Sequence, residues 1–164
     1  MVRFESSVGI SKYICSTNLY IMVYVSRKEH FNAAHKLYNP NWSATKNEEI
    51  FGACANENWH GHNFELTVTV VGSPDHETGF VIDLKLLSEL IRLEVIDVVD
   101  HKNLNLDIPF LEGKMPTIEI LLIEFWKILE PKVNALASSG KLYKLLLTET
   151  NKQFAEYFGE EGNR

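Results

Sequence analysis

The segment from Cys54 to His62, which reads CANENWHGH, contains the side chains best suited to metal and thiol chemistry. Its two histidines, His60 and His62, are separated by a single glycine. Side chains alternate between the two faces of an extended chain, so both imidazoles would lie on one face and could share a metal ion. A surface turn without metal is the alternative, because this short pattern also occurs by chance.

His35 supplies the third nitrogen ligand that a metal site would need. It ends an expected strand at residues 23–35, whose early valines and aromatic residues suit a pleated surface. If this strand pairs with the one that follows His62, the three imidazoles meet. Three neutral imidazoles with an open fourth position are typical of catalytic zinc, whereas structural zinc normally has four protein ligands. The sequence therefore predicts a zinc site formed by His35, His60 and His62.

Cys54 lies six residues before His60 in a polar loop. A thiol beside a divalent cation can ionise near neutral pH and serve as a base or a nucleophile. The alternative is a buried cysteine that acts as a small hydrophobe, which the polar loop makes less favourable. Cys15 has no predicted cation site beside it, and we expect it to be inert.

Three acidic residues and one further histidine complete the candidates. Asp100 and His101 follow an expected helix, where they are either a solvated helix end or a proton shuttle that turns back toward the metal. Glu149 continues an apolar strand face, either as an ion-paired edge residue or as an anchor for a ligand with paired N–H donors. Glu119 stands in the first turn of a helix, where a negative charge is favourable.

Hydrophobic periodicity predicts the elements that must position these side chains. Strands are expected at residues 23–35, 64–71, 80–82, 142–148 and 154–158. Helices are expected from the Asp83 cap to about residue 98, and from Thr117 to an end limited by Pro131. The loop at residues 39–59 has room for at most a short helix, where Thr45 has capping-box spacing. In the strand at 142–148 the odd positions share one face, which continues to Glu149: Tyr143, Leu145 and Leu147.

The element order β-β-(β)-α-α-β predicts an α+β fold, with an antiparallel sheet and two helices on one face. The first helix has two apolar rows, and a single sheet cannot bury both. The second row consists of Leu86, Leu90 and Leu93. We therefore expect this row to contact another subunit.

Composition predicts one globular domain at residues 22–164, since the 164 residues are 45% hydrophobic and 23% charged. Residues 1–21 lack a clear hydrophobic pattern. We expect them to be an accessory or disordered extension, or the result of a start codon assigned too early. A net charge of −6 disfavours nucleic acid and anionic membranes as partners. The sequence has no apolar run of about 20 residues, no secretory signal and two cysteines, which predicts a cytoplasmic protein.

Five separated motifs resemble the family of 6-pyruvoyl-tetrahydropterin synthase and 6-carboxytetrahydropterin synthase, from about residue 23 to 160. They are FNAAHKLY, FGACANENWHGHNFELTV, DHKNLN, PTIE and TET, in that order. The resemblance implies the tunnelling fold, or T-fold, in which subunits join their sheets into a barrel. It also implies a homohexamer built from two trimers, with active sites at subunit interfaces.

The resemblance assigns a role to each candidate. His35, His60 and His62 would hold Zn²⁺, Cys54 would abstract a proton, and Asp100 with His101 would complete the relay. Glu149 would anchor the pterin ring, with Thr117 and Glu119 near the pocket. We also expect Lys36 to help bind the triphosphate. Ile120 departs from the asparagine usual in the family, which affects the polar detail of the pocket.

The implied activity is that of a lyase converting 7,8-dihydroneopterin triphosphate to 6-pyruvoyl-tetrahydropterin with loss of triphosphate. The first alternative is the 6-carboxytetrahydropterin synthase of queuosine synthesis, which releases acetaldehyde and triphosphate from the same substrate. In that enzyme the cysteine usually stands closer to the HGH motif, whereas five residues separate Cys54 from His60 here. The second alternative is a non-catalytic zinc-binding T-fold assembly protein, which would have no need of Cys54, Asp100, His101 and Glu149 together.

Overall fold

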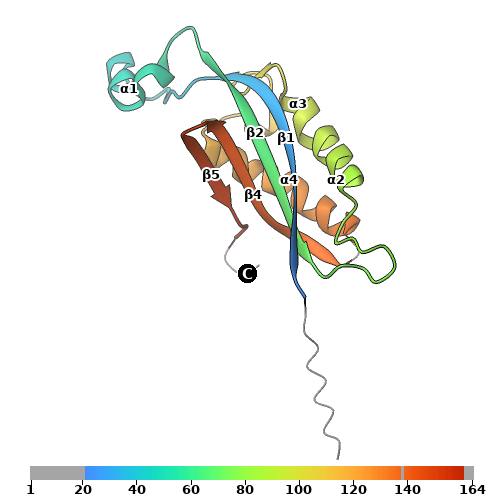
Figure 1. Ribbon diagram of the computed structural model, residues 1–164. Coiled ribbons are helices and arrows are strands. Elements are labelled where there is room, and N and C mark those ends of the chain that lie inside the picture. The colour runs from blue at the N-terminus through green and yellow to red at the C-terminus, as the bar shows by residue number, and fades with distance from the viewer. Residues whose placement is uncertain (1–20, 138, 161–164) are drawn as a thin grey trace, which may run out of the picture.

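Figure 1 shows the computed structural model of the chain, which describes residues 21–137 and 139–160. The strands are β1 (Val23–His35), β2 (His60–Gly72), β3 (Lys102–Asn103), β4 (Gly140–Thr150) and β5 (Gln153–Tyr157). They form one sheet in the order β3-β1-β2-β4-β5. The expected extension, except for Ile21, and Cys15 lie outside the described residues.

The helical elements confirm the α+β class. They are α1 (Ala44–Phe51), η1 (Gly52–Ala55), α2 (Leu84–Ile91), η2 (Arg92–Ile96), α3 (Asp97–Val99), η3 (Pro109–Leu111) and α4 (Ile118–Leu136). The long helix α4 and the helical run α2-η2-α3 cover one face of the sheet, while α1 projects beyond one end of it (Figure 1). The core lies between them and includes the fully buried rings of Phe31, Phe64 and Phe125. No helix in the described ranges is long and apolar enough to cross a membrane.

β1 and β2 pair along their whole length, from Val23 opposite Gly72 to His35 opposite His60. β2 therefore begins four residues before the expected start at Phe64, because β1 continues to His35 and offers it a partner. Side chains alternate in burial along β1 as expected, with Phe31, Ala33 and His35 on the helix-covered face.

The sheet is mixed, so the expectation of a purely antiparallel sheet is wrong at one edge. β3 runs parallel to β1 at Ala33 and Ala34. His101 takes a positive φ of 57°, and its N–H donates to the Asn32 carbonyl at 2.6 Å. This turn sends the chain back alongside β1 in the same direction, and Leu104 N–H donates to the Ala34 carbonyl at 2.8 Å.

The expected strand at residues 80–82 is wrong. Val81 and Ile82 are buried, which explains their strand-like pattern, but they lie in a loop. The chain before them closes on itself, with Asp75 N–H bonded to the Phe80 carbonyl and Gly79 N–H to the Asp75 carbonyl. Backbone groups of this segment therefore pair within a turn rather than with a neighbouring strand.

The first expected helix is confirmed, with Asp83 accepting hydrogen bonds from the backbone of Lys85 and Leu86. It contains one π-helical turn, η2, before it ends at Val99. The second begins at its Thr117 cap as expected but continues through Pro131 to Leu136, so the predicted end is wrong. Its buried stripe continues past the proline to Val133, and this packing outweighs the one lost backbone donor.

The short helix in the long loop is confirmed as α1, but its cap is Ser43 rather than Thr45. Ser43 Oγ accepts a hydrogen bond from Lys46 N–H at 3.2 Å. Tyr143 also departs from expectation, because the register between β2 and β4 shifts between Thr69 and Val70. The shift turns Tyr143 to the uncovered face, where its ring lies 4.7 Å from that of Tyr24.

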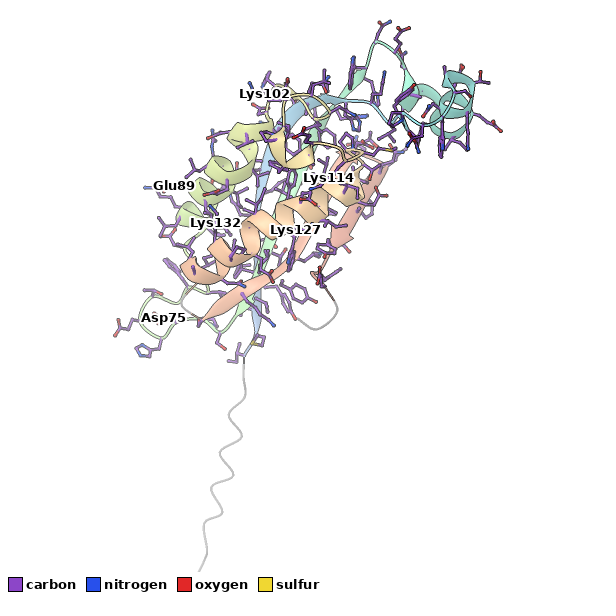
Figure 2. The ribbon with its side chains drawn as sticks, turned by 180° about the vertical axis from the view of Figure 1, so that it is seen from behind. Asp75, Glu89, Lys102, Lys114, Lys127 and Lys132 are labelled. Carbon is purple, nitrogen blue, oxygen red and sulfur yellow. The ribbon has the colours of Figure 1, made fainter. Side chains whose placement is uncertain are left out.

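An ion-pair cluster surrounds the buried Glu124 of α4 at the helix side of the molecule. Glu124 contacts Lys114 and Lys127, each at 2.8 Å, and both lysines are labelled beside this helix in Figure 2. Burial raises the pKa of Glu124, but the hydrogen bonds from the two ammonium groups outweigh it and leave that pKa below its usual value. The carboxylate therefore stays ionised in the folded chain.

Candidate functional site

The three predicted histidine ligands meet at the end of the β1 and β2 hairpin. His35 stands opposite His60 in the ladder, and His62 follows on the same face. One ring nitrogen from each lies within 4.8 Å of the others. The ring centroids of His35 lie 4.5 Å from His60 and 5.2 Å from His62. The pairing of β1 with β2 therefore brings together the three residues that strand parity predicted.

The ring hydrogen bond of His35 uses Nδ1 and leaves Nε2 available to bind a cation. Its Nδ1 donates to the Pro116 carbonyl at 2.9 Å, which directs the lone pair of Nε2 toward the other histidines. Nε2 of His35 and both ring nitrogens of His60 are buried without a hydrogen-bond partner. Unpartnered buried nitrogens are costly, and a divalent cation would satisfy them. The donor set thus fits a metal ion.

Burial lowers the pKa of all three imidazoles. The neighbouring imidazoles add to this effect at His60 and His62, while the Pro116 carbonyl and the Glu149 carboxylate act against it at His35. The neutral form is the one that binds metals. Sequence reasoning missed the Pro116 carbonyl, although the PTIE motif contains this residue and its place before the Thr117 cap leaves its carbonyl outside the helical hydrogen bonds.

Glu149 lies beside the histidines, with Oε1 at 3.3 Å from His35 Nε2 and 3.6 Å from His62 Nε2. Its position falls between Thr148 and Thr150, where the register of β4 and β5 shifts, and such bulges redirect side chains. Burial raises the pKa of Glu149; His35 opposes this shift and nearby Glu119 adds to it. The predicted anchor therefore shares one region with the histidines and with Glu119.

Thr117 stands next to this region, since it caps α4 directly after Pro116, whose carbonyl contacts His35. Its Oγ accepts a hydrogen bond from Ile120 N–H at 3.4 Å. The first turn of α4 thus carries Thr117 and Glu119 toward the histidine end of the sheet.

Cys54 lies in η1 and is half-buried. Its carbonyl accepts a hydrogen bond from Leu37 N–H at 2.9 Å, so the thiol loop runs beside the segment that follows His35. The cluster of possible metal ligands in the described chain contains the three histidines and not Cys54.

Lys36 carries its ammonium group 5.0 Å from the ring centroids of both Tyr38 and Trp59. It lines a cavity of about 850 Å³ between this strand end and the α1 and η1 segment. Trp59 has a positive φ of 65°, which is strained for a large side chain and immediately precedes His60. The Lys36 ammonium group therefore lies at this cavity and not at the histidine cluster.

Asp100 and His101 are joined to each other and to the edge of β1. Asp100 Oδ1 accepts a hydrogen bond from Asn32 N–H at 2.7 Å, and its Oδ2 lies 2.8 Å from His101 Nδ1. The Asn32 hydrogen bond is the main cause that lowers the pKa of Asp100. The His101 side chain is 76% exposed and borders an open hollow of about 440 Å³. In a single chain this pair faces outward.

Comparison with known proteins agrees with the motifs. Residues 24–160 match the family model described as 6-pyruvoyl tetrahydropterin synthase. A 6-pyruvoyl tetrahydrobiopterin synthase of Pongo abelii is 37% identical over 83% of this chain and 91% of its own length. The 6-carboxy-5,6,7,8-tetrahydropterin synthase of Bacillus subtilis is 22% identical over 84% of this chain and 86% of its own length.

The fold has a similar neighbour among solved structures. The 6-pyruvoyl tetrahydropterin synthase of Caenorhabditis elegans aligns with a TM-score of 0.75 and 35% identity. The alignment covers 86% of this chain and 98% of that one. The sheet and its helical layer therefore follow an architecture already seen in a pterin synthase.

Proposed function

Since the chain belongs to the 6-pyruvoyl tetrahydropterin synthase family, we propose that it is a lyase that converts 7,8-dihydroneopterin triphosphate to 6-pyruvoyl-tetrahydropterin. The observation that carries this proposal is the meeting of three neutral histidines with one largely buried carboxylate, Glu149, at the end of the sheet. A metal centre beside an anchor for paired N–H donors suits a pterin better than a simple phosphate ester.

His35, His60 and His62 are the residues that would hold zinc. When bound there, the ion would supply Lewis-acid polarisation of substrate oxygens. The Pro116 carbonyl would hold His35 in the tautomer that binds with Nε2, since an outer hydrogen bond of this kind orients a ligand.

Glu149 would fix the pterin ring. Its carboxylate can accept two parallel hydrogen bonds from the guanidine-like edge, and burial strengthens such charge-assisted bonds. Glu119 and Thr117 would border the same ring from the start of α4. Positioning of this kind supplies a large share of catalysis in an elimination, because the carbon acid and the base must be aligned.

Cys54 would take the proton from the side-chain carbon, and Asp100 with His101 would exchange protons with the reacting groups. The electron pair of the broken C–H bond forms a double bond as the C–O bond to triphosphate breaks. Tautomerisation then oxidises the side chain and reduces the ring by equal amounts, so the conversion requires no external electron carrier. Lys36 would assist departure of the triphosphate by pairing with its charge.

We infer that the site is completed between subunits of a homohexamer of two trimers. Two observations support this inference. Leu86 and Leu93 of the predicted second row are 45% and 67% exposed, whereas Leu90 packs partly against the core. Asp100 and His101 face outward in the single chain, which a neighbouring subunit could exploit.

A product assay tests the proposal. The zinc-loaded protein is incubated with 7,8-dihydroneopterin triphosphate, and the products are identified by mass spectrometry. We expect triphosphate and the 6-pyruvoyl pterin without acetaldehyde. Acetaldehyde with a 6-carboxy pterin would assign the chain to the queuosine branch, and absence of triphosphate release would leave the non-catalytic assembly role.

A further inference from the structure

Asn105 makes a two-point contact with the backbone of Lys36. Its Oδ1 accepts from Lys36 N–H at 3.0 Å, and its Nδ2 donates to the Lys36 carbonyl at 2.9 Å. The carboxamide thus replaces a neighbouring strand just where β1 ends. It belongs to the DHKNLN motif, in which the proposed chemistry uses only Asp100 and His101.

The clamped residue connects two parts of the proposed site. Lys36 directly follows the metal ligand His35, and the next residue, Leu37, donates its N–H to the Cys54 carbonyl at 2.9 Å. A fixed backbone at Lys36 therefore holds the Leu37 donor in place, and through it the loop that carries the thiol.

Asn105 is itself held rigidly. Its N–H donates to Asn103 Oδ1 at 3.0 Å, and Asn103 N–H donates to Asp107 Oδ2 at 2.8 Å. The preceding Leu104 is fully buried and bonds to the Ala34 carbonyl. The loop that begins with Asp100 and His101 is thus fastened to β1 on both sides of His35.

We propose that Asn105 is a positioning residue, whose carboxamide sets the Cys54 loop and the relay loop at a fixed distance from the strand that carries His35. The proposal rests on the function proposed above. Reaction partners displaced by about 1 Å can lose roughly a hundredfold in rate. Loss of the clamp should therefore lower kcat while substrate and metal still bind.

The test compares Asn105→Ala, Asn105→Asp and Asn134→Ala in the assembled, zinc-loaded protein. Asn134 is the matched control, because its Oδ1 accepts from Leu142 N–H at 2.7 Å at the other end of β4. We expect Asn105→Ala to lose between about tenfold and a hundredfold in kcat, with KM and bound zinc unchanged. Asn105→Asp keeps the acceptor for Lys36 N–H but turns a second acceptor toward the Lys36 carbonyl, so it should recover at most part of that loss. Asn134→Ala should keep kcat within about twofold.

Residue-resolved hydrogen–deuterium exchange gives a readout that does not depend on turnover. In Asn105→Ala the amides of Lys36 and Leu37 should both exchange faster, by about tenfold. Unchanged exchange at Leu37, or a loss of kcat no larger than that of Asn134→Ala, would overturn the proposal. If the unmodified protein releases no triphosphate, the proposed function fails, and exchange at Leu37 alone decides whether the clamp holds the thiol loop.

Discussion

Replacement of Glu149 by glutamine probes the proposed pterin anchor without changing its shape. The carboxylate offers two charged acceptors, and glutamine replaces one of them with a donor that opposes the N–H groups of the ring. A hydrogen bond to a charged group contributes about 1.5–3 kcal/mol. With the side chain only 14% exposed, water can replace little of this loss. We therefore expect a loss of about 3 kcal/mol, or roughly a hundredfold in kcat/KM.

Steady-state triphosphate release measures this loss, and pterin binding by fluorescence quenching shows whether it appears in affinity. Metal content should stay unchanged, because Glu149 is not among the three nitrogen ligands. Glu65→Gln is the control, since Glu65 lies in the neighbouring strand and pairs with Lys28 at 2.9 Å on the uncovered face. It should keep kcat/KM within about twofold. An effect of less than about fivefold for Glu149→Gln would refute the anchoring role.

Three further predictions concern the base, the metal and the acid response. Cys54→Ala should keep its zinc and lose at least about a hundredfold in kcat, and unchanged turnover would remove Cys54 from the mechanism. Zinc at a hundred times its dissociation constant should raise the free energy of unfolding by about 2.7 kcal/mol, measured by urea titration with and without a chelator. His60→Ala should abolish this gain, whereas exposed His76→Ala should keep it; retention of the gain in His60→Ala would contradict the ligand assignment. Because the pKa of Glu124 is lower in the folded chain than in the unfolded chain, its stabilisation is complete above the unfolded pKa and is lost as pH falls. Glu124→Gln should therefore lose less unfolding free energy than the unmodified protein between about pH 6 and about pH 3, and an equal loss would exclude this carboxylate as a source of the acid sensitivity.

The histidine end of the site could be predicted from sequence because strand parity selects its three residues, once the two strands are assumed to pair. His60 and His62 share a face by alternation, and His35 continues the buried positions of β1. The helix caps Asp83 and Thr117 were likewise predictable, since a cap requires only a side chain and the next few backbone donors. Local rules select these residues, and the only long-range assumption needed was that the two strands pair.

Features that depend on distant contacts were not predictable. β3 exists because the left-handed His101 turns the chain onto Asn32, and no local pattern specifies that pairing. Tyr143 changes face because of a register shift that needs β2 as its partner. The sequence of Val81 and Ile82 suggests a strand because both residues are apolar and buried, but burial alone does not supply a hydrogen-bonded partner strand. The outward position of His101 also follows from this long-range geometry.

If the histidines bind a metal as proposed, the pairing of His35 with His60 would make metal uptake a measure of correct hairpin assembly. A slip of one residue between β1 and β2 would turn one set of side chains to the opposite face. Either His35 or the pair His60 and His62 would then face the uncovered side, and the three nitrogens could not converge. Metal binding would therefore stabilise only the native alignment of these two strands. It would favour the correct register during folding, before any substrate is bound.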